Sequence, residues 1–540
     1  MQNFSRRTLL TGTAALAGTV TAGIAAGVTA APALAQEQAQ KPAQTACPRP
    51  LAADRFFSQP QRRKLAVQWA RDTWTSLVAM TDEHTGLPAD NISQGLSAAE
   101  RSGYTSPTNI GGYLWSTVVA RELGIITAAE SRQRLKQTLG TLGRMEKHEP
   151  SGMYYNWYDE ATATKLTGWP GSGDPVQPFL SSVDNGWLAA ALMVVRTADP
   201  SVSAQANRLL NKMNFASFYN PDARPEQHTG LIRGGFWVDK PSGVSVEGDY
   251  LGTGTPVYYT ANHYDTTVSE TRIVSYIGIS RGQIPAESYF ATWRTFPDGA
   301  DWSWQEQKPV GQSRRYRGID VYEGAYNYRG FRVVPGWGGS MFEALMPDMF
   351  VPEAEWAPKS WGVNHPLTVR AHREHGLEEA KYGYWGFSPA SNPTGGYSEW
   401  GVDAVGLNSE GYFSDLERSN VDLGYPGSRE ATNPHPAFGD GVVTPHAAFL
   451  AMAHEPQEAF ENLQKIQTVL KAYGKGGFYD AVAVKSGTIA TRYLSLDQAM
   501  VMGSLGNVLA GNLIKRSFIR GEVSRIIPTV IGPEVFGAGV

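Results

Sequence analysis

The sequence predicts an all-α protein with the (α/α)6-barrel fold, in which six helical hairpins close into a ring. Amphipathic stretches with Lys, Arg, Glu and Gln on one face alternate six times with apolar stretches rich in small residues. Each apolar stretch follows a loop that contains Ser, Thr, Asp or Asn, the residue types that cap helix N-termini. We therefore expect the apolar helices to form the inner ring, with their N-terminal ends gathered at one mouth. An irregular α-helical protein is the alternative.

The amphipathic stretches are the expected outer helices. They cover residues 61–80, 128–146, 201–212, 367–380 and 456–473, with a shorter one near 285–295. The loops that precede the expected inner helices lie at residues 106–111, 182–187, 263–267, 336–341, 440–445 and 493–498. Two long insertions, 221–260 and 385–439, interrupt the alternation, and we expect short strands or structured loops over the mouth there.

Composition excludes several classes of function. With 47 Lys and Arg against 51 Asp and Glu, the chain has a net charge of −4, which gives no electrostatic reason to expect a nucleic-acid partner. Cys47 is the only cysteine, so an intrachain disulfide and cysteine-based metal centres are excluded. The sequence holds no P-loop and no G-x-G-x-x-G motif. We expect neither a cofactor nor a metal.

The N-terminus has the pattern of an export signal. Arg6 and Arg7 form a twin-arginine pair, a weakly apolar stretch follows over 11–31, and Ala33-Leu34-Ala35 supplies a small-x-small cleavage site. We expect residues 1–35 to be a signal peptide that the twin-arginine export machinery recognises, so that the mature protein is periplasmic or secreted and not inserted in the membrane. A membrane anchor is the alternative. The expected domains are a linker over 36–55, a catalytic domain over 56–520 and a C-terminal tail over 521–540.

Aromatic and polar side chains gather in the loops at the expected mouth. Aromatic faces stack on the C–H faces of sugar rings, and carboxylates, amides and guanidinium groups bond their hydroxyls. Core packing is the alternative for any single Trp. The candidate substrate-binding residues are Asn109, Tyr155, Trp157, Asp184, Asn185, Trp187, Tyr264, Asp265, Arg272, Trp337, Trp385, Trp400 and Asp403.

Carboxyl groups at the same mouth could cleave a glycosidic bond. The reaction needs two of them, one to protonate the leaving oxygen and one to activate water or attack directly. The carboxyls available in these loops are Asp265, Glu270, Glu343, Glu399, Asp403, Glu410 and Asp440. For each of them, helix capping or pairing with an arginine is the alternative role.

Several of these loops resemble motifs of the glucoamylase-like domain that occurs in cyclic β-1,2-glucan synthases and is related to endo-β-1,2-glucanases. The runs, in order, are YDTTVSETRI at 264–273, SYIGISRG at 275–282, GGSMFEALMP at 338–347, WGFS at 385–388 and DGVVTPHA at 440–447. The likeness extends from about Asn109 to Phe518. It implies an (α/α)6 barrel that acts on glycans.

The resemblance also implies roles for single residues. Glu270 matches the proton donor of the family. The glutamate nucleophile of the synthases is missing, because the corresponding stretch reads Ser388-Pro389-Ala390. This departure favours an inverting hydrolase, with Asp440 as the first candidate for the base and Glu399 as the second.

We therefore expect an exported glycoside hydrolase that cleaves an oligo- or polysaccharide, with a β-1,2-glucan-like chain as the first substrate to test. A polysaccharide lyase on the same barrel, with His263 or a tyrosine as base, is the second hypothesis. A non-catalytic glycan-binding protein is the third, because the nucleophile position is empty of a carboxylate.

Overall fold

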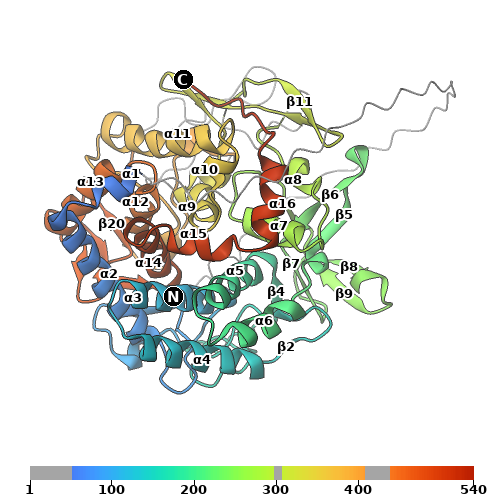
Figure 1. Cartoon of the computed structure of the whole chain (residues 1–540), viewed down its shortest axis with the longest axis horizontal. Coiled ribbons are helices and arrows are strands. Elements are labelled where there is room, and N and C mark those ends of the chain that lie inside the picture. The colour runs from blue at the N-terminus through green and yellow to red at the C-terminus, as the bar shows by residue number, and fades with distance from the viewer. Residues whose placement is uncertain (1–51, 297–306, 408–437) are drawn as a thin grey trace.

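The computed structural model describes residues 52–296, 307–407 and 438–540, and within them six helices form a closed inner ring (Figure 1). These are α3 (Pro107–Glu122), α5 (Ser182–Ala198), α7 (Arg272–Ser280), α9 (Met341–Leu345), α12 (Pro445–Ala451) and α14 (Ser495–Leu509). Helix α5 packs on α3 and α7, α12 packs on α9 and α14, and α14 closes the ring on α3. Hydrogen bonds from Arg272 to carbonyls of α9 join the remaining pair. The predicted (α/α)6 barrel is confirmed.

An outer layer of helices covers this ring. Around the ring, α2 (Pro60–Met80) packs on α14, α4 (Ala128–Arg144) on α3, α6 (Ser203–Lys212) on α5, α16 (Glu522–Ile531) on α7, α11 (Trp361–Glu374) on α9 and α13 (Pro456–Thr468) on α12. Four shorter helices complete the helical part: α1 (Ala52–Phe56) packs on α13 and α14, α8 (Ser288–Ala291) on β6, α10 (Glu353–Trp356) on α11 and α16, and α15 (Leu513–Phe518) on α5 and α14.

The C-terminal segment is part of the barrel. The expected outer helix near 285–295 is only the four-residue α8, because the chain then turns so that Trp293 donates its backbone N–H to the Asp265 carbonyl. Helix α16 fills the outer position instead and buries Val523, Ile527 and Val530. The prediction of a separate tail over 521–540 is therefore wrong.

Small residues let the inner helices approach one another closely. Helix α3 begins at Pro107 after Ser106, whose hydroxyl accepts the backbone N–H of Asn109. A Cβ placed on Gly112 would lie 2.7 Å from the Cβ of Ala499, so only glycine permits the contact between α3 and α14 at this level.

Two predicted helix boundaries are wrong. Helix α11 begins at Trp361, before the expected 367, because Pro366 is accommodated inside the helix at the loss of one backbone hydrogen bond. It continues as a π-helical turn over His375–Glu379. Helix α13 ends at Thr468, and Tyr473 already belongs to a strand.

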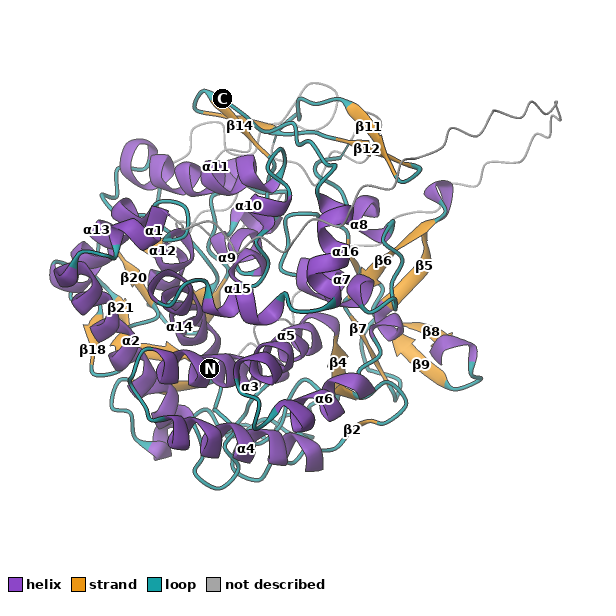
Figure 2. Ribbon diagram, viewed as in Figure 1, coloured by secondary structure: helices purple, strands orange, loops and turns teal. Residues whose placement is uncertain are grey.

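Short antiparallel strands surround the helical ring (Figure 2). The 221–260 insertion forms strands, as expected. It contributes to a four-stranded sheet of β4 (Phe179–Ser181), β7 (Gly235–Trp237), β9 (Pro256–Tyr259) and β8 (Val246–Asp249), and to a three-stranded sheet of β10 (His263–Tyr264), β6 (Thr229–Arg233) and β5 (Tyr219–Arg224). A second three-stranded sheet contains β17 (Val442–Val443), β20 (Ala481–Ala483) and β21 (Ile489–Ala490).

The remaining strands form two-stranded pairs. These are β1 (Asn91–Ser93) with β22 (Arg492–Leu494), β2 (Lys147–His148) with β3 (Met153–Tyr154), β11 (Ser313–Tyr316) with β12 (Ile319–Tyr322), β13 (Tyr326–Tyr328) with β14 (Phe331–Val333), β15 (Ala390–Ser391) with β16 (Tyr397–Ser398), and β18 (Tyr473–Gly474) with β19 (Gly477–Phe478). The predicted signal peptide, nearly all of the linker and Glu410 lie outside the described residues.

Among the helices that the structure describes, we find none that combines the length and the apolar character needed to span a lipid bilayer.

Candidate active site

Glu270 is held by contacts from the two neighbouring inner helices. It lies two residues before α7 and is buried. The indole N–H of Trp187 on α5 donates a hydrogen bond of 2.6 Å to Oε2 of Glu270. The backbone N–H of Glu270 donates a bond of 2.7 Å to Oε2 of Glu343 on α9. The Glu270 carboxyl group is thus fixed from one side, and its backbone from the other.

Glu343 is the carboxylate that the structure places against Glu270. Ser340 caps α9 and accepts the backbone N–H of Glu343, which directs this residue into the first turn of the helix. The stretch that lacks the synthase nucleophile runs along the same helix start, because Phe342 donates its backbone N–H to Oγ of Ser388 at 2.8 Å. Glu343 was among the carboxyls expected at the mouth but was not among the predicted catalytic residues. Its position three residues after a capping serine is the signal that could have selected it.

Polar side chains at the starts of α3 and α5 contact one another. The hydroxyl of Thr108 donates to Oδ1 of Asp184, and the amide of Asn109 donates to Oδ1 of Asp90 at 2.9 Å. The Asn185 amide binds the backbone N–H and carbonyl of Tyr154 and the carbonyl of Ser181. Asn185 therefore anchors β3 to α5, whereas substrate binding by Asn109 and Asp184 stays a prediction.

Three of the tryptophans predicted to bind substrate are core residues. Trp187 and Trp400 have no exposed surface, and Trp385 has 2%. Trp385 is fixed through its backbone, since Asn462 accepts its N–H and donates to its carbonyl. A sugar needs an accessible ring face, so the substrate-binding assignment of these three residues is wrong, and the Trp187 indole instead bonds Glu270.

Two other predicted tryptophans keep accessible surface. Trp157 and Trp337 are both half-buried, as is Tyr264. Trp157 packs edge-on against Tyr104 and lies at 5.5 Å, between ring centroids, from Trp169. The backbones of Tyr158 and Thr105 bond each other, so this aromatic group belongs to the loops that lead into α3 and α5. Tyr155 is buried, with the Lys165 ammonium 4.4 Å from its ring centroid.

Arg272 is buried and fully engaged with protein groups. Its guanidinium pairs with the Glu353 carboxylate and donates to the carbonyls of Ser269, Glu343 and Ala344. No donor is left to bind a substrate hydroxyl, so the substrate-binding assignment of Arg272 is wrong.

Asp265 and Asp403 occupy different surroundings. Asp265 is partly exposed; burial raises its pKa, and the Arg224 guanidinium opposes this shift. Asp403 is buried at the start of a short 3-10 turn over Asp403–Val405. Substrate binding by both residues stays a prediction.

The two candidate bases differ in their contacts. Asp440 was expected at the N-terminus of α12, but Thr444 occupies the N-cap position of this helix. Instead, Oδ1 of Asp440 accepts the backbone N–H of Ser486 in the turn between β20 and β21. Glu399 is partly buried, and this burial raises its pKa to about 7. Glu399 also belongs to the loop that joins α9, because Val402 donates its backbone N–H to the Gly339 carbonyl at 3.0 Å.

A buried pair of carboxyl groups that was not among the predicted catalytic residues lies beside the start of α14, with Asp480 directly before β20 and Asp497 in the first turn of the helix. Burial and the neighbouring Asp497 raise the pKa of Asp480 well above its usual value. Oδ2 of Asp480 accepts the backbone N–H of Ser391 at 2.6 Å, and Oδ2 of Asp497 lies 3.6 Å from Nδ1 of His446. Asp497 could have been found from its place in the first turn of α14, but Asp480 sits in a β-hairpin segment without a distinguishing pattern.

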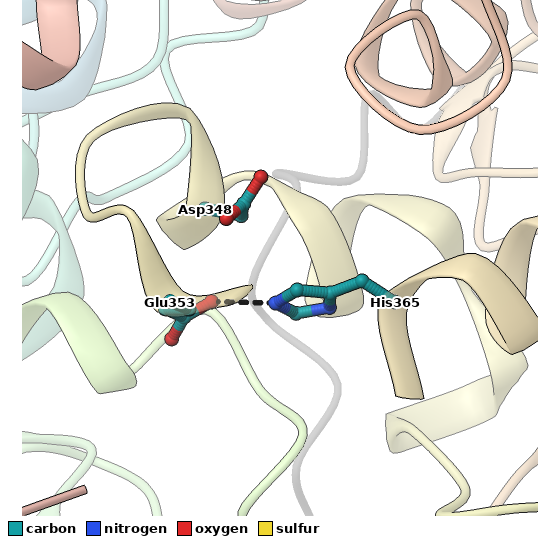
Figure 3. A group of neighbouring side chains, drawn as sticks. All are labelled: Asp348, Glu353 and His365. Carbon is teal, nitrogen blue, oxygen red and sulfur yellow. Dashed lines mark hydrogen bonds and ion pairs between the residues drawn. The ribbon is translucent and has the colours of Figure 1, made fainter. Parts of the chain in front are cut away.

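A second buried cluster, drawn in Figure 3, has residue types that bind metals. Asp348, Glu353 and His365 place potential ligand atoms within 4.8 Å of one another. However, Lys515 lies 3.1 Å from Oδ2 of Asp348, and Arg272 pairs with Glu353. Burial alone would raise the pKa values of both carboxyls, but these cations lower them. The negative charges of the two carboxylates are already cancelled by the positive charges of Lys515 and Arg272. A divalent ion added here would leave a net positive charge buried, so these residues do not fit a metal site.

Comparison with known proteins agrees with the motif-based resemblance. Residues 262–520 match a family model described as "Putative glucoamylase", and residues 68–222 match one described only as a protein of unknown function. The cyclic β-(1,2)-glucan synthase of Rhizobium meliloti (strain 1021) is 23% identical over 607 residues that cover 87% of this chain and 19% of the synthase. The chain thus spans about a fifth of the length of this curated relative.

Solved structures share the fold. The endo-β-1,2-glucanase from Chitinophaga pinensis, in complex with sophorotriose and glucose, is 16% identical with a TM-score of 0.58, covering 87% of this chain and 98% of that one. The endo-β-1,2-glucanase from Talaromyces funiculosus, in complex with sophorose, is 12% identical with a TM-score of 0.55, covering 88% and 93%. The predicted resemblance to the glucoamylase-like family is confirmed.

Proposed function

We propose that this chain is a glycoside hydrolase that cleaves a β-1,2-glucan-like chain. The observation that carries the proposal is the fixed carboxyl group of Glu270, buried where three inner helices meet and bonded to Trp187. A carboxyl group whose orientation is set by the protein can deliver a proton to one specific oxygen. The barrel shared with endo-β-1,2-glucanases and the likeness to a β-1,2-glucan synthase support the choice of substrate.

In the proposed reaction Glu270 is the general acid. The Trp187 indole occupies Oε2, and Oε1 carries the proton to the leaving oxygen of the glycosidic bond. The sequence offers no carboxylate at the nucleophile position of the synthases, so water is the attacking group and the anomeric configuration inverts.

Of the two predicted bases, the contacts favour Glu399. Its loop bonds the segment that leads into α9, next to Glu343 and Glu270. A general base works best when its pKa lies near the working pH, which suits a carboxyl group with a pKa of about 7. Asp440, in contrast, already has one carboxylate oxygen engaged by the backbone of Ser486.

The half-buried aromatic residues supply the glycan contacts in this proposal. Tyr104, Trp157 and Trp169 lie together on the loops before α3 and α5, and Trp337 lies before α9. Their exposed edges and faces lie on the loops that enter the inner helices, where the sugar chain would pass. Asn109, Asp184 and Asp265 provide hydrogen-bonding groups for its hydroxyls.

The lyase alternative has less support. Burial, with the nearby Arg233 and Arg224, lowers the pKa of His263 to about 4, and the His263 ring bonds the Asn220 amide. Such an imidazole is a weak base for removing a proton from carbon.

Export by the twin-arginine route, with cleavage after Ala35, is also part of the proposal. Replacing Arg6 and Arg7 by Lys should leave precursor in the cytoplasm.

A panel of defined glycans, including β-1,2-glucan, tests the function directly. Products are analysed by mass: hydrolysis adds one water per cleavage, a lyase leaves unsaturated ends, and a binding protein leaves the glycan intact. We expect hydrolysis of β-1,2-glucan. Unsaturated products, or no product from any glycan in the panel, would overturn the proposal.

A further inference from the structure

Arg272 connects the backbone segments that carry Glu270 and Glu343. On one side its Nη1 donates to the carbonyl of Ser269, directly before Glu270, at 2.9 Å. On the other side it reaches α9, with bonds to the carbonyls of Glu343 at 3.2 Å and Ala344 at 2.7 Å. The same guanidinium therefore spans the two segments that the Glu270–Glu343 hydrogen bond also joins.

The guanidinium is itself held rigidly. Its Nε and Nη2 form a two-pronged pair with the Glu353 carboxylate, at 2.8 and 3.2 Å, and its Cζ lies 4.2 Å from the Trp361 ring centroid. Glu353 in turn accepts bonds from Tyr276 and pairs with Nε2 of His365 at 2.9 Å (Figure 3). A planar fork of this kind loses little freedom on binding, so it transmits its position to the carbonyls it bonds.

Burial of the Arg272–Glu353 ion pair costs free energy of desolvation, which indicates a role beyond packing. Arg272 and Glu353 have 4% and 0% exposed side-chain surface. A buried ion pair is often replaceable by apolar residues without loss of stability, but it fixes geometry when its donors are used in several directions. Arg272 uses its donors in three directions, toward the Glu270 loop, α9 and α10.

We propose that Arg272, oriented by Glu353, is the positioning residue that sets the distance and orientation between Glu270 and Glu343. This inference rests on the proposed function for its catalytic consequence. Arg272 does not touch the substrate; it acts through the two glutamates. A displacement of about 1 Å of a reacting group can lower the rate about 10²-fold, so weaker hydrogen bonding by Arg272 to these segments should lower kcat.

Arg272→Lys tests this positioning role, because lysine keeps the positive charge opposite Glu353 but lacks the planar guanidinium group. We expect kcat per folded molecule to fall about 10²-fold while KM stays within about threefold, because the substrate contacts are unchanged. The Trp187 indole signal in 15N-labelled protein, assigned through Trp187→Phe, should shift in Arg272→Lys, because this indole binds Glu270. That signal needs no activity.

Arg294→Lys is the matched control. Arg294 is also fully buried, pairs with Glu534 and lies over Tyr289, but the contacts we find for it in the described chain reach no residue of the site. It should lose stability and keep both kcat per folded molecule and the Trp187 signal. Glu353→Gln, which weakens the ionic partner of Arg272, should move the signal in the same direction as Arg272→Lys and lower kcat less.

The outcomes separate the two proposals. A wild-type chain that hydrolyses no glycan defeats the proposed function, while the Trp187 signal still decides the positioning role. A Trp187 signal unchanged in both Arg272→Lys and Glu353→Gln would overturn the positioning role, as would equal effects of Arg272→Lys and Arg294→Lys.

Discussion

The indole N–H of Trp187 donates a 2.6 Å hydrogen bond to the carboxylate of Glu270, which follows it by 83 residues in the chain. The sequence suggested that Trp187 binds the substrate, but its ring has no exposed surface. In the proposed mechanism, the Trp187 indole orients the carboxyl group of Glu270, the general acid.

Replacing Trp187 by Phe should lower kcat while the protein stays folded. Phenylalanine keeps most of the buried ring but removes the N–H that orients the protonated carboxyl group of Glu270, and a hydrogen bond between neutral groups contributes about 0.5–1.5 kcal/mol. We expect kcat to fall by up to about tenfold. Trp115→Phe is the control, because Trp115 is equally buried but donates to the Ala499 carbonyl. Equal kcat losses in the two variants would contradict the assigned role.

Replacing Trp157 by Ala should weaken glycan binding without unfolding the protein. The residue is half-buried, and aromatic stacking contributes about 1–3 kcal/mol per ring in comparable sites. Titration calorimetry with a non-hydrolysing Glu270→Gln background measures the change. Trp400→Ala, in the core, should instead lower the melting temperature strongly. If Trp157→Ala keeps its affinity and loses stability, the ring is a packing residue.

The stability of the protein should depend on pH through Glu399. Burial raises the pKa of this group to about 7 in the folded state, above the ordinary value of 4.5. The folded state therefore binds more protons than the unfolded state between these pH values, and stability falls as pH rises through this window. Glu399→Gln should match the wild type near pH 4 and be more stable by about 1–3 kcal/mol at pH 8. Denaturant unfolding at the two pH values provides the measurement, and a variant that is equally or less stable at pH 8 would contradict the shift.

Truncation after Arg520 should unfold or severely destabilise the barrel. It removes α16 from the outer face of α7 and takes away Glu534, the nearest acidic partner of the buried Arg294, so that only the more distant Glu323 remains, at 4.0 Å. Breaking a buried ion pair costs about 3–5 kcal/mol. Thermal unfolding of the truncated chain checks this. A stable, cooperative truncated protein would restore the interpretation of 521–540 as a C-terminal tail outside the catalytic domain.

The barrel could be predicted because its signal is local and repeated. Charged faces alternate with small apolar residues, and the side chains of Ser106, Ser181 and Ser340 cap three of the six inner helices in the structure. The sequence could not predict that α16, rather than a helix near 285–295, covers α7. Helix α16 lies more than 200 residues after α7 and reaches it only through tertiary packing.

The site was predicted only in part for a similar reason. Motif resemblance selected Glu270, but the sequence does not reveal which faces of Trp187, Trp385 and Arg272 are buried. The pairing of Asp480 with Asp497 joins a hairpin to a helix and leaves no pattern in either segment. Such contacts depend on how the ring closes.

The most direct test of the central claim compares wild type and Glu270→Gln on two substrates. One is β-1,2-glucan, whose leaving sugar needs a proton; the other is an activated aryl glycoside of the same linkage, whose leaving group needs none. We predict that Glu270→Gln loses glucan hydrolysis by a factor of about 10² or more and keeps measurable cleavage of the aryl glycoside. Glucan hydrolysis by Glu270→Gln at the wild-type rate would show that Glu270 is not the proton donor.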